Sequence, residues 1–131
     1  MHPRVSLSAI SSFSWSLDQD LTFYESAGIT NIGASLAKLD KAGFASGAQK
    51  ISNAGLRVTN LIGIGPFRLD DPGQWPAQQE RIKHALEAAH TVNAECLVLT
   101  TGPAGAMSWN DAANALASAL QPILADTGGI K

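Results

Sequence analysis

Short apolar segments alternate with longer helical segments along this chain, and this alternation constrains the fold more than any other feature. Segments with the spacing or composition of strands lie at residues 4–10, 29–35, 56–65 and 95–101. Each is followed by a segment with helical spacing, at residues 16–28, 38–55, 76–94 and 108–129. Strict alternation of strand and helix predicts a parallel sheet with right-handed crossovers and helices on the outside.

The joints between each helix and the following strand are alike. Gly28 and Gly55 close the first two helices, and Gly128 and Gly129 close the fourth. Glycine adopts the left-handed conformation that ends a helix without steric cost. The apolar Ile130 then follows, so we expect the chain to end at the start of a fifth strand.

Two architectures fit a parallel alternation of strands and helices: a doubly wound open sheet and a (βα)8 barrel. A dinucleotide-binding sheet requires G-x-G-x-x-G after its first strand, but residues 11–16 read SSFSWS, without glycine. The acidic cluster of a response-regulator-like sheet is also missing there. A barrel closes with eight units, and this chain has four. We therefore predict an α/β fold in which residues 1–131 form a single domain, the (βα)4 half of a TIM barrel.

Charge and composition disfavour several classes of partner. The net charge is −2 and the nine Lys and Arg residues are scattered, so no nucleic-acid groove is expected. No apolar run reaches the roughly 18 residues of a membrane span, and the N-terminus lacks a signal-peptide pattern. The single Cys96 rules out an internal disulfide and favours the cytoplasm. Charged residues make up only 15% of the chain, which indicates apolar surface covered by a partner.

Four stretches together carry a resemblance to a known family. They read GITNIG (28–33), AGLRVTNLIG (54–63), RIKHALEAAHTVNAECLVLTTGP (81–103) and SWNDAANALASAL (108–120). In this order they resemble the N-terminal half of a sugar phosphate isomerase/epimerase of the xylose-isomerase-like TIM-barrel superfamily. The apurinic-site endonuclease branch of that superfamily has metal-binding His residues at the ends of its third and fourth strands. This chain has none there, which disfavours nuclease chemistry.

The resemblance implies a metal-dependent enzyme whose chemistry lies in the second half of the barrel. The family's divalent metal, of the Mn, Mg, Zn or Co class, is held by two Glu, an Asp and a His of that half, and no ligand can be carried over to this chain. The first half is expected to form the wall of the substrate pocket from the loops after its strands. The matching substrate-binding positions are Ser12, Phe13, Trp15, Ser35, Gly65, Pro66, Phe67, Thr101, Gly102 and Trp109.

Several side chains have two interpretations. Phe13 and Trp15 either provide apolar faces for the C–H groups of a sugar or plug the mouth of the barrel. Arg68 is the one cation on a loop at the expected active face, where it is a candidate for a substrate phosphate or carboxylate. His84 has acidic residues at metal-ligand spacing on its helix. That helix is expected in the outer ring, so a structural role is favoured.

Two functions follow from this interpretation. In the first, the chain belongs to a metal-dependent isomerase or epimerase of a small sugar or polyol, and contributes the pocket wall without the catalytic Glu residues. The chain alone is then expected to be inactive. In the second, the chain is a half-barrel assembly unit or a non-catalytic subunit, which self-associates or pairs with a complementing chain to cover its open strand edges.

Overall fold

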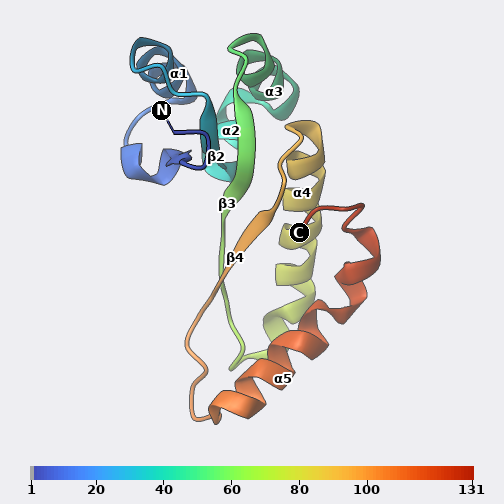
Figure 1. The fold of residues 1–131 in the computed structure, drawn as a ribbon. Coiled ribbons are helices and arrows are strands. Elements are labelled where there is room, and N and C mark those ends of the chain that lie inside the picture. The colour runs from blue at the N-terminus through green and yellow to red at the C-terminus, as the bar shows by residue number, and fades with distance from the viewer. Residues whose placement is uncertain (1) are drawn as a thin grey trace.

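The computed structural model describes residues 2–131 and contains one parallel sheet of four strands (Figure 1). The strands lie side by side in chain order, and each pairs in parallel with the next. They are β1 (Leu7–Ser8), β2 (Asn31–Ser35), β3 (Arg57–Phe67) and β4 (Leu97–Thr101). Parallel strands in this order, joined through helices, form the (βα)4 half of a TIM barrel and confirm the predicted fold class.

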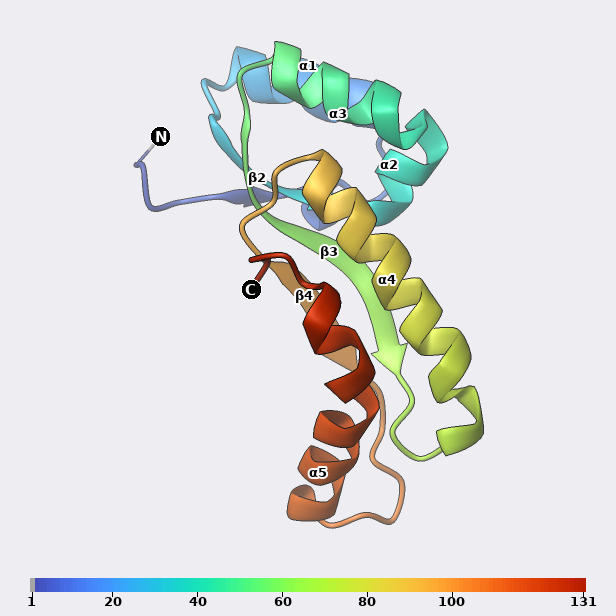
Figure 2. The same cartoon turned by 90° about the vertical axis from the view of Figure 1, so that its right-hand side faces the viewer.

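The connections between the strands are helical, and the helices wrap around one side of the sheet (Figure 2). The α-helices are α1 (Leu17–Ser26), α2 (Leu36–Ala42), α3 (Phe44–Asn53), α4 (Trp75–Thr91) and α5 (Trp109–Leu120). Three short 3-10 helices are also present: η1 (Ala9–Ser12), η2 (Pro72–Gln74) and η3 (Gln121–Asp126). Both α2 and α4 pack against β3, so the hydrophobic core lies between the sheet and this helical layer.

Strand β3 is the centre of the core. Its buried side chains recur at every third position, and the register shifts once against β2 and twice against β4 along this strand. They are Val58, Leu61, Ile64 and Phe67, and they belong to one cluster with the buried side chains of α4, which are Ile82, Ala85, Leu86, Ala88 and Ala89. The small alanines let α4 approach the sheet closely.

The helix expected over residues 38–55 is two helices. Gly43 separates α2 from α3 with φ of +77°, a left-handed backbone conformation that an α-helix cannot contain. The apolar spacing continues across this break, which is why the sequence pattern indicated a single helix. The break matters for the candidate site, because it places α2 alone across the carboxyl end of β2.

The first strand is shorter than expected. Pairing with β2 is confined to Leu7 and Ser8, and the chain then turns into η1. The Ser8 side chain caps this turn by accepting a hydrogen bond from the Ile10 amide at 3.3 Å. The alternation of residues 4–10 therefore overestimated the strand, since serine also favours local turns.

The segment expected as the last helix changes character at Gln121, where α5 gives way to η3. Pro122 has no amide hydrogen to donate, so the regular helix cannot continue through it. Beyond Gly129, residues 130–131 are not a strand, but Lys131 is hydrogen-bonded along β4. Its amide donates to the Glu95 carbonyl at 3.3 Å, and its carbonyl accepts from the Leu97 amide at 2.9 Å. This is the bonding pattern of a parallel neighbour of β4.

Strand β4 differs from β2 in its burial. All five residues of β2 are buried, whereas Leu97, Val98 and Leu99 of β4 are only half-buried. The apolar run at residues 95–101 had indicated burial on both faces, which residues 2–131 do not provide. Within these residues no helix is both long enough and apolar enough to cross a membrane.

Candidate functional site

The loop after β1 and the start of α2 meet at the carboxyl edge of the sheet. Phe13 and Trp15 lie in that loop with 83% and 41% of their surface exposed, so both present rings to solvent. The Trp15 ring packs edge-on against Phe23 of α1, with ring centroids 5.7 Å apart. The loop is thus held against α1, and its aromatic side chains remain free to contact a ligand.

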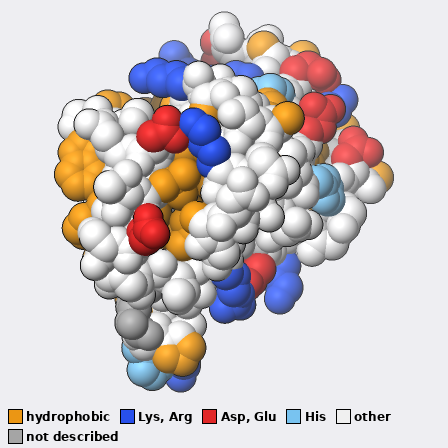
Figure 3. All heavy atoms as spheres, turned by 90° about the horizontal axis from the view of Figure 1, so that it is seen from above, with side chains coloured by type: hydrophobic (Ala, Val, Ile, Leu, Met, Phe, Trp, Pro, Cys, Tyr) orange, Lys and Arg blue, Asp and Glu red, His pale blue; other side chains and the backbone are white. Residues whose placement is uncertain are grey.

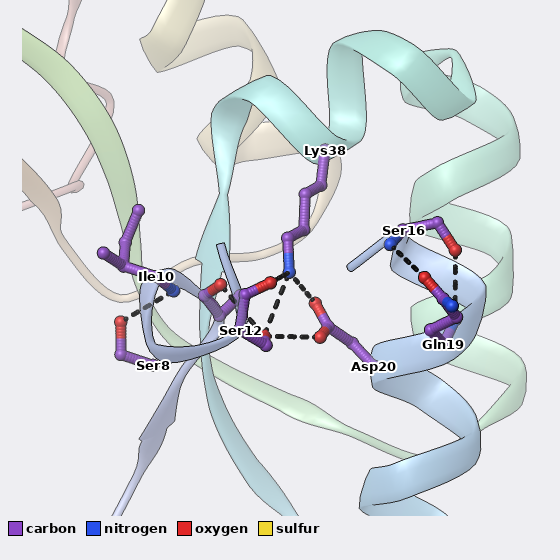
Figure 4. Close-up of polar contacts among 8 residues, drawn as sticks. Ser8, Ile10, Ser12, Ser16, Gln19, Asp20 and Lys38 are labelled. Atoms are coloured by element: carbon purple, nitrogen blue, oxygen red, sulfur yellow. Dashed lines mark hydrogen bonds and ion pairs between the residues drawn. The ribbon is translucent and has the colours of Figure 1, made fainter. Parts of the chain in front are cut away.

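A buried polar network fixes the base of this loop (Figure 4). The Lys38 ammonium, from the first turn of α2, donates to Asp20 Oδ2 at 2.5 Å and to the Ser12 carbonyl at 2.9 Å. It also donates to Ser12 Oγ at 3.0 Å, and Ser12 Oγ lies 2.5 Å from Asp20 Oδ1. Three segments of the chain therefore converge on one charged pair: η1, α1 and α2.

Burial makes this network important to the fold. The Asp20 carboxylate is fully buried and only 8% of the Lys38 side chain is exposed. Charges in such a position are tolerated only when each is paired and hydrogen-bonded, as both are here. The ammonium uses all three of its donors within the network, so Lys38 and Ser12 hold the loop in place and have no group left over for a substrate.

Tyr24 lies beside this network and is also buried. Its hydroxyl has no hydrogen-bond partner within the described residues. Burial, together with the negative charge of Asp20, raises the pKa of Tyr24 to about 12. The phenol is therefore neutral at physiological pH and does not act there as a base.

Ser35 ends β2 and stands at the first turn of α2, where it is buried. It lines a hollow of about 740 Å³ together with residues of the β1–α1 loop. Of the predicted substrate-binding residues, Phe13, Trp15 and Ser35 thus share one concave surface. Ser12 lies beneath the loop and lines a neighbouring groove of about 490 Å³ on the β1 side.

The remaining predicted residues lie apart from this hollow, around the ends of β3 and β4. Phe67 has only 2% of its surface exposed and belongs to the hydrophobic core, so its ring is not available to a ligand. Its carbonyl accepts a hydrogen bond from the Gly102 amide at 2.8 Å. Thr101 is exposed at the end of β4, and Trp109 is 86% exposed at the start of α5.

Arg68 is engaged within its own loop. Its guanidinium Nε and Nη2 lie 3.2 and 3.1 Å from the two carboxylate oxygens of Asp70. This hydrogen-bonded pair holds the pKa of Asp70 below its usual range and raises that of Arg68. The Arg68 carbonyl also accepts from the Trp75 indole at 3.1 Å. The predicted substrate cation is therefore part of a surface ion pair in this structure.

Sequence reasoning missed Asp20, Lys38 and Tyr24. One signal was present: Asp20 falls on the apolar side of α1, between Leu17 and Tyr24, where a carboxylate needs a buried partner. Acidic residues also favour the first turn of a helix, and this preference explained the position of Asp20 equally well. The sequence therefore did not identify Asp20 as a buried charge. No pattern in the sequence identified Lys38 as that partner.

His84 has a structural role. It lies on α4 with Nε2 3.3 Å from Asp40 Oδ1, and its ring packs on Phe44, with centroids 4.8 Å apart. Among residues 2–131, no group of three or more His, Cys, Asp or Glu side chains is placed to hold a metal ion.

The fold and the site define half of a β/α barrel with aromatic and polar residues on the loops after its strands. The structure is similar to protein SMc04130 from Sinorhizobium meliloti 1021, with a TM-score of 0.82 and 20% identity over 95% of this chain and 46% of that one. It is also similar to a xylose isomerase-like TIM barrel/4-hydroxyphenylpyruvate dioxygenase fusion protein, with a TM-score of 0.71 and 15% identity over 96% of this chain and 20% of that one.

The chain therefore spans less than half the length of either structure. No family model matches the sequence, and no curated protein matches it significantly. At these identities the likeness concerns the fold alone. It confirms the half-barrel fold, and one of the two similar structures is described as a xylose isomerase-like TIM barrel fusion protein.

Proposed function

We propose that this chain forms the substrate-pocket wall of a sugar or sugar phosphate isomerase/epimerase. The observation that carries the proposal is the loop after β1, which presents Phe13 and Trp15 to solvent beside Ser35 at the carboxyl edge of the sheet. Active sites of β/α barrels lie at this edge. Exposed aromatic rings next to polar groups suit a sugar, because its C–H face packs on the ring while its hydroxyls form hydrogen bonds.

In this proposal, the chain binds the substrate, and the catalytic groups lie outside the chain. Isomerisation beside a carbonyl requires an acid and a base, and a divalent metal in such enzymes polarises the sugar oxygens. The described residues do not fit that metal, since they contain no group of ligands to hold it. We therefore assign no metal-dependent step to this chain, and we expect a metal of the Mn, Mg, Zn or Co class in the remainder of such an enzyme. We place the protein in the cytoplasm, without nucleic-acid or membrane partners.

The proposal is tested by measuring sugar binding to the chain itself. Saturation-transfer NMR with fructose is expected to show contact with the aromatic loop. Trp15→Ala should weaken binding about fivefold, since an aromatic contact of this kind contributes about 1 kcal/mol. Leu124→Ala, which removes an exposed side chain on η3, should leave it unchanged. Equal fructose binding by the wild-type and Trp15→Ala chains would contradict the proposal.

A second function, assembly of a barrel from two copies of the chain, is favoured by the open edge of β1. The groove of about 490 Å³ beside this strand is lined by Leu7, Trp15, Phe23 and Tyr24, together with Phe13 and four serines. Seen from above, hydrophobic side chains gather on one side of the molecule (Figure 3). We propose that β4 of a second copy pairs with this β1 and that the C-terminal helices of that copy pack in the groove. The two copies would together form a closed eight-stranded barrel. A monomer at micromolar concentration in sedimentation would contradict this assembly.

A further inference from the structure

The hollow beside the aromatic loop is lined by several lysines. Three of the five lysines in the chain line it: Lys38, Lys41 and Lys50. Its one acidic lining residue is Asp18, and its volume of about 740 Å³ lies within the range of small-molecule sites. The hollow extends from the β1–α1 loop to α2 and α3, so its walls come from three connected helices and the loop that carries Phe13 and Trp15.

Two of these lysines are neutralised by partners. Lys38 points down from α2 to Asp20 and Ser12 and uses all its donors there (Figure 4). Lys50 lies 2.6 Å from Asp18 across the gap between α3 and α1. Neither ammonium is free to take up an additional anion without first losing its partner.

Lys41 is different, because it has neither an ion pair nor a side-chain hydrogen bond among residues 2–131. It lies in the last turn of α2, is exposed, and lines the hollow. The lining of the hollow therefore has one uncompensated positive charge. The first turn of α1 also lines the hollow, and its Asp18 is the partner of Lys50.

The part of the lining that comes from the β1–α1 loop includes two aromatic rings, Phe13 and Trp15. Trp15 is held edge-on against Phe23, and its loop is anchored from below through Ser12. A ring fixed in this way offers a contact face at little cost in conformational entropy. The hollow thus combines a rigidly held aromatic ring with one free ammonium group in its lining.

We propose that this hollow binds a small sugar carrying one anionic group, with the phosphate or carboxylate at Lys41 and the sugar C–H face on Trp15. The sugar part of this inference rests on the proposed function, whereas the anionic part rests on the charges of the hollow. A single flexible ammonium acts as a point charge, so it accepts either phosphate or carboxylate. The β1–α1 loop and α2 are the elements that would determine the preference for charged sugars.

The test is a titration of the isotope-labelled chain by NMR with four probes: inorganic phosphate, glucose 6-phosphate, gluconate and glucose. Glucose 6-phosphate is expected to shift amide signals of residues 13–19 and 37–42, and gluconate distinguishes a carboxylate from a phosphate. Lys41→Met should weaken glucose 6-phosphate binding about tenfold, as expected for the loss of one charge-assisted contact. Lys41→Arg retains the charge and should stay within about threefold of the wild type.

Lys83→Met is the matched control, because Lys83 pairs with Glu80 on α4 and does not line the hollow. The inference is overturned if Lys41→Met and Lys83→Met bind glucose 6-phosphate equally, or if the shifted amides lie outside the two segments. It is also overturned if glucose binds as tightly as glucose 6-phosphate, and the proposed sugar function then survives. If inorganic phosphate binds through Lys41 as tightly as glucose 6-phosphate, the anionic site stands and the sugar function fails.

Discussion

At the scale of residues, the Asp20–Lys38 pair has the largest expected effect on stability. Its two charges are almost fully removed from water, and each is satisfied only by the other and by Ser12. Removing one partner leaves the other charge buried without compensation. We expect Lys38→Met to lower the free energy of unfolding by about 3–5 kcal/mol, measured by urea denaturation.

The control for this variant is Lys50→Met, which breaks the Lys50–Asp18 pair on the surface. Both side chains of that pair are substantially exposed, so its loss should cost less than about 1 kcal/mol. Replacing both buried charges, as in Lys38→Met with Asp20→Leu, should cost less than the sum of the two single changes, because no charge then remains buried. Equal losses for Lys38→Met and Lys50→Met would show that the buried pair does not support the fold.

Tyr24 gives a second expected outcome at this scale, through the dependence of stability on pH. It is the only tyrosine in the chain, so its ionisation can be followed by ultraviolet absorbance without overlap. The pKa of the Tyr24 phenol is 10.0 in the unfolded chain and about 12 in the folded chain. The unfolded chain therefore loses this proton first as the pH rises. The ionisation of Tyr24 therefore leaves the free energy of unfolding unchanged below pH 10 and lowers it between pH 10 and 12.

Tyr24→Phe isolates this contribution from the lysines that titrate in the same range. The substitution also removes a buried hydroxyl that has no partner in residues 2–131, so it should leave stability at pH 7 unchanged or slightly raised. The difference in stability between wild type and Tyr24→Phe should change only above pH 10. A constant difference from pH 7 to 12 would mean that the phenol is not perturbed by its surroundings.

At the scale of elements, the order and type of most segments followed from the sequence. Apolar spacing located the four strands and the outer helices, and the left-handed joints at Gly28 and Gly55 confirm where α1 and α3 end, whereas Gly128 follows the end of η3. Asn93 takes the same conformation, with φ of +52°, at the joint without glycine. Spacing cannot reveal a break such as Gly43, because the apolar pattern continues on both sides of it.

The candidate site was predictable only in part, for a similar reason. The rule that loops follow the carboxyl ends of strands placed Phe13, Trp15 and Ser35 on one surface. It did not distinguish a ring that points to solvent from one that enters the core, and Phe67 is in the core. The Lys38–Asp20 ion pair joins residues 18 positions apart, so spacing along the chain could not identify it.

At the scale of the whole molecule, the half-barrel has two different edges. At one edge, the β4 backbone is hydrogen-bonded to Lys131 near its start, and its side chains are half-buried. At the other edge, β1 pairs for only two residues and is flanked by an aromatic groove. Exposed edges and apolar grooves of this kind favour association with another strand and helix. Such a partner would also change the surroundings of Trp15, so assembly and sugar binding are expected to be linked.

Assembly through the β1 edge is tested by placing a charge in the groove. Phe23 lines the groove and is 41% exposed, so Phe23→Glu should be tolerated by the monomer at a modest cost in stability. In an assembly of two copies the new carboxylate would be buried without a partner, which costs several kcal/mol for each interface. We expect Phe23→Glu to shift the chain from dimer to monomer in analytical ultracentrifugation. Gln49→Glu adds the same charge on the exposed face of α3, outside the groove, and should leave the dimer intact. Equal sedimentation of the two variants as dimers would place the contact between copies away from the β1 edge.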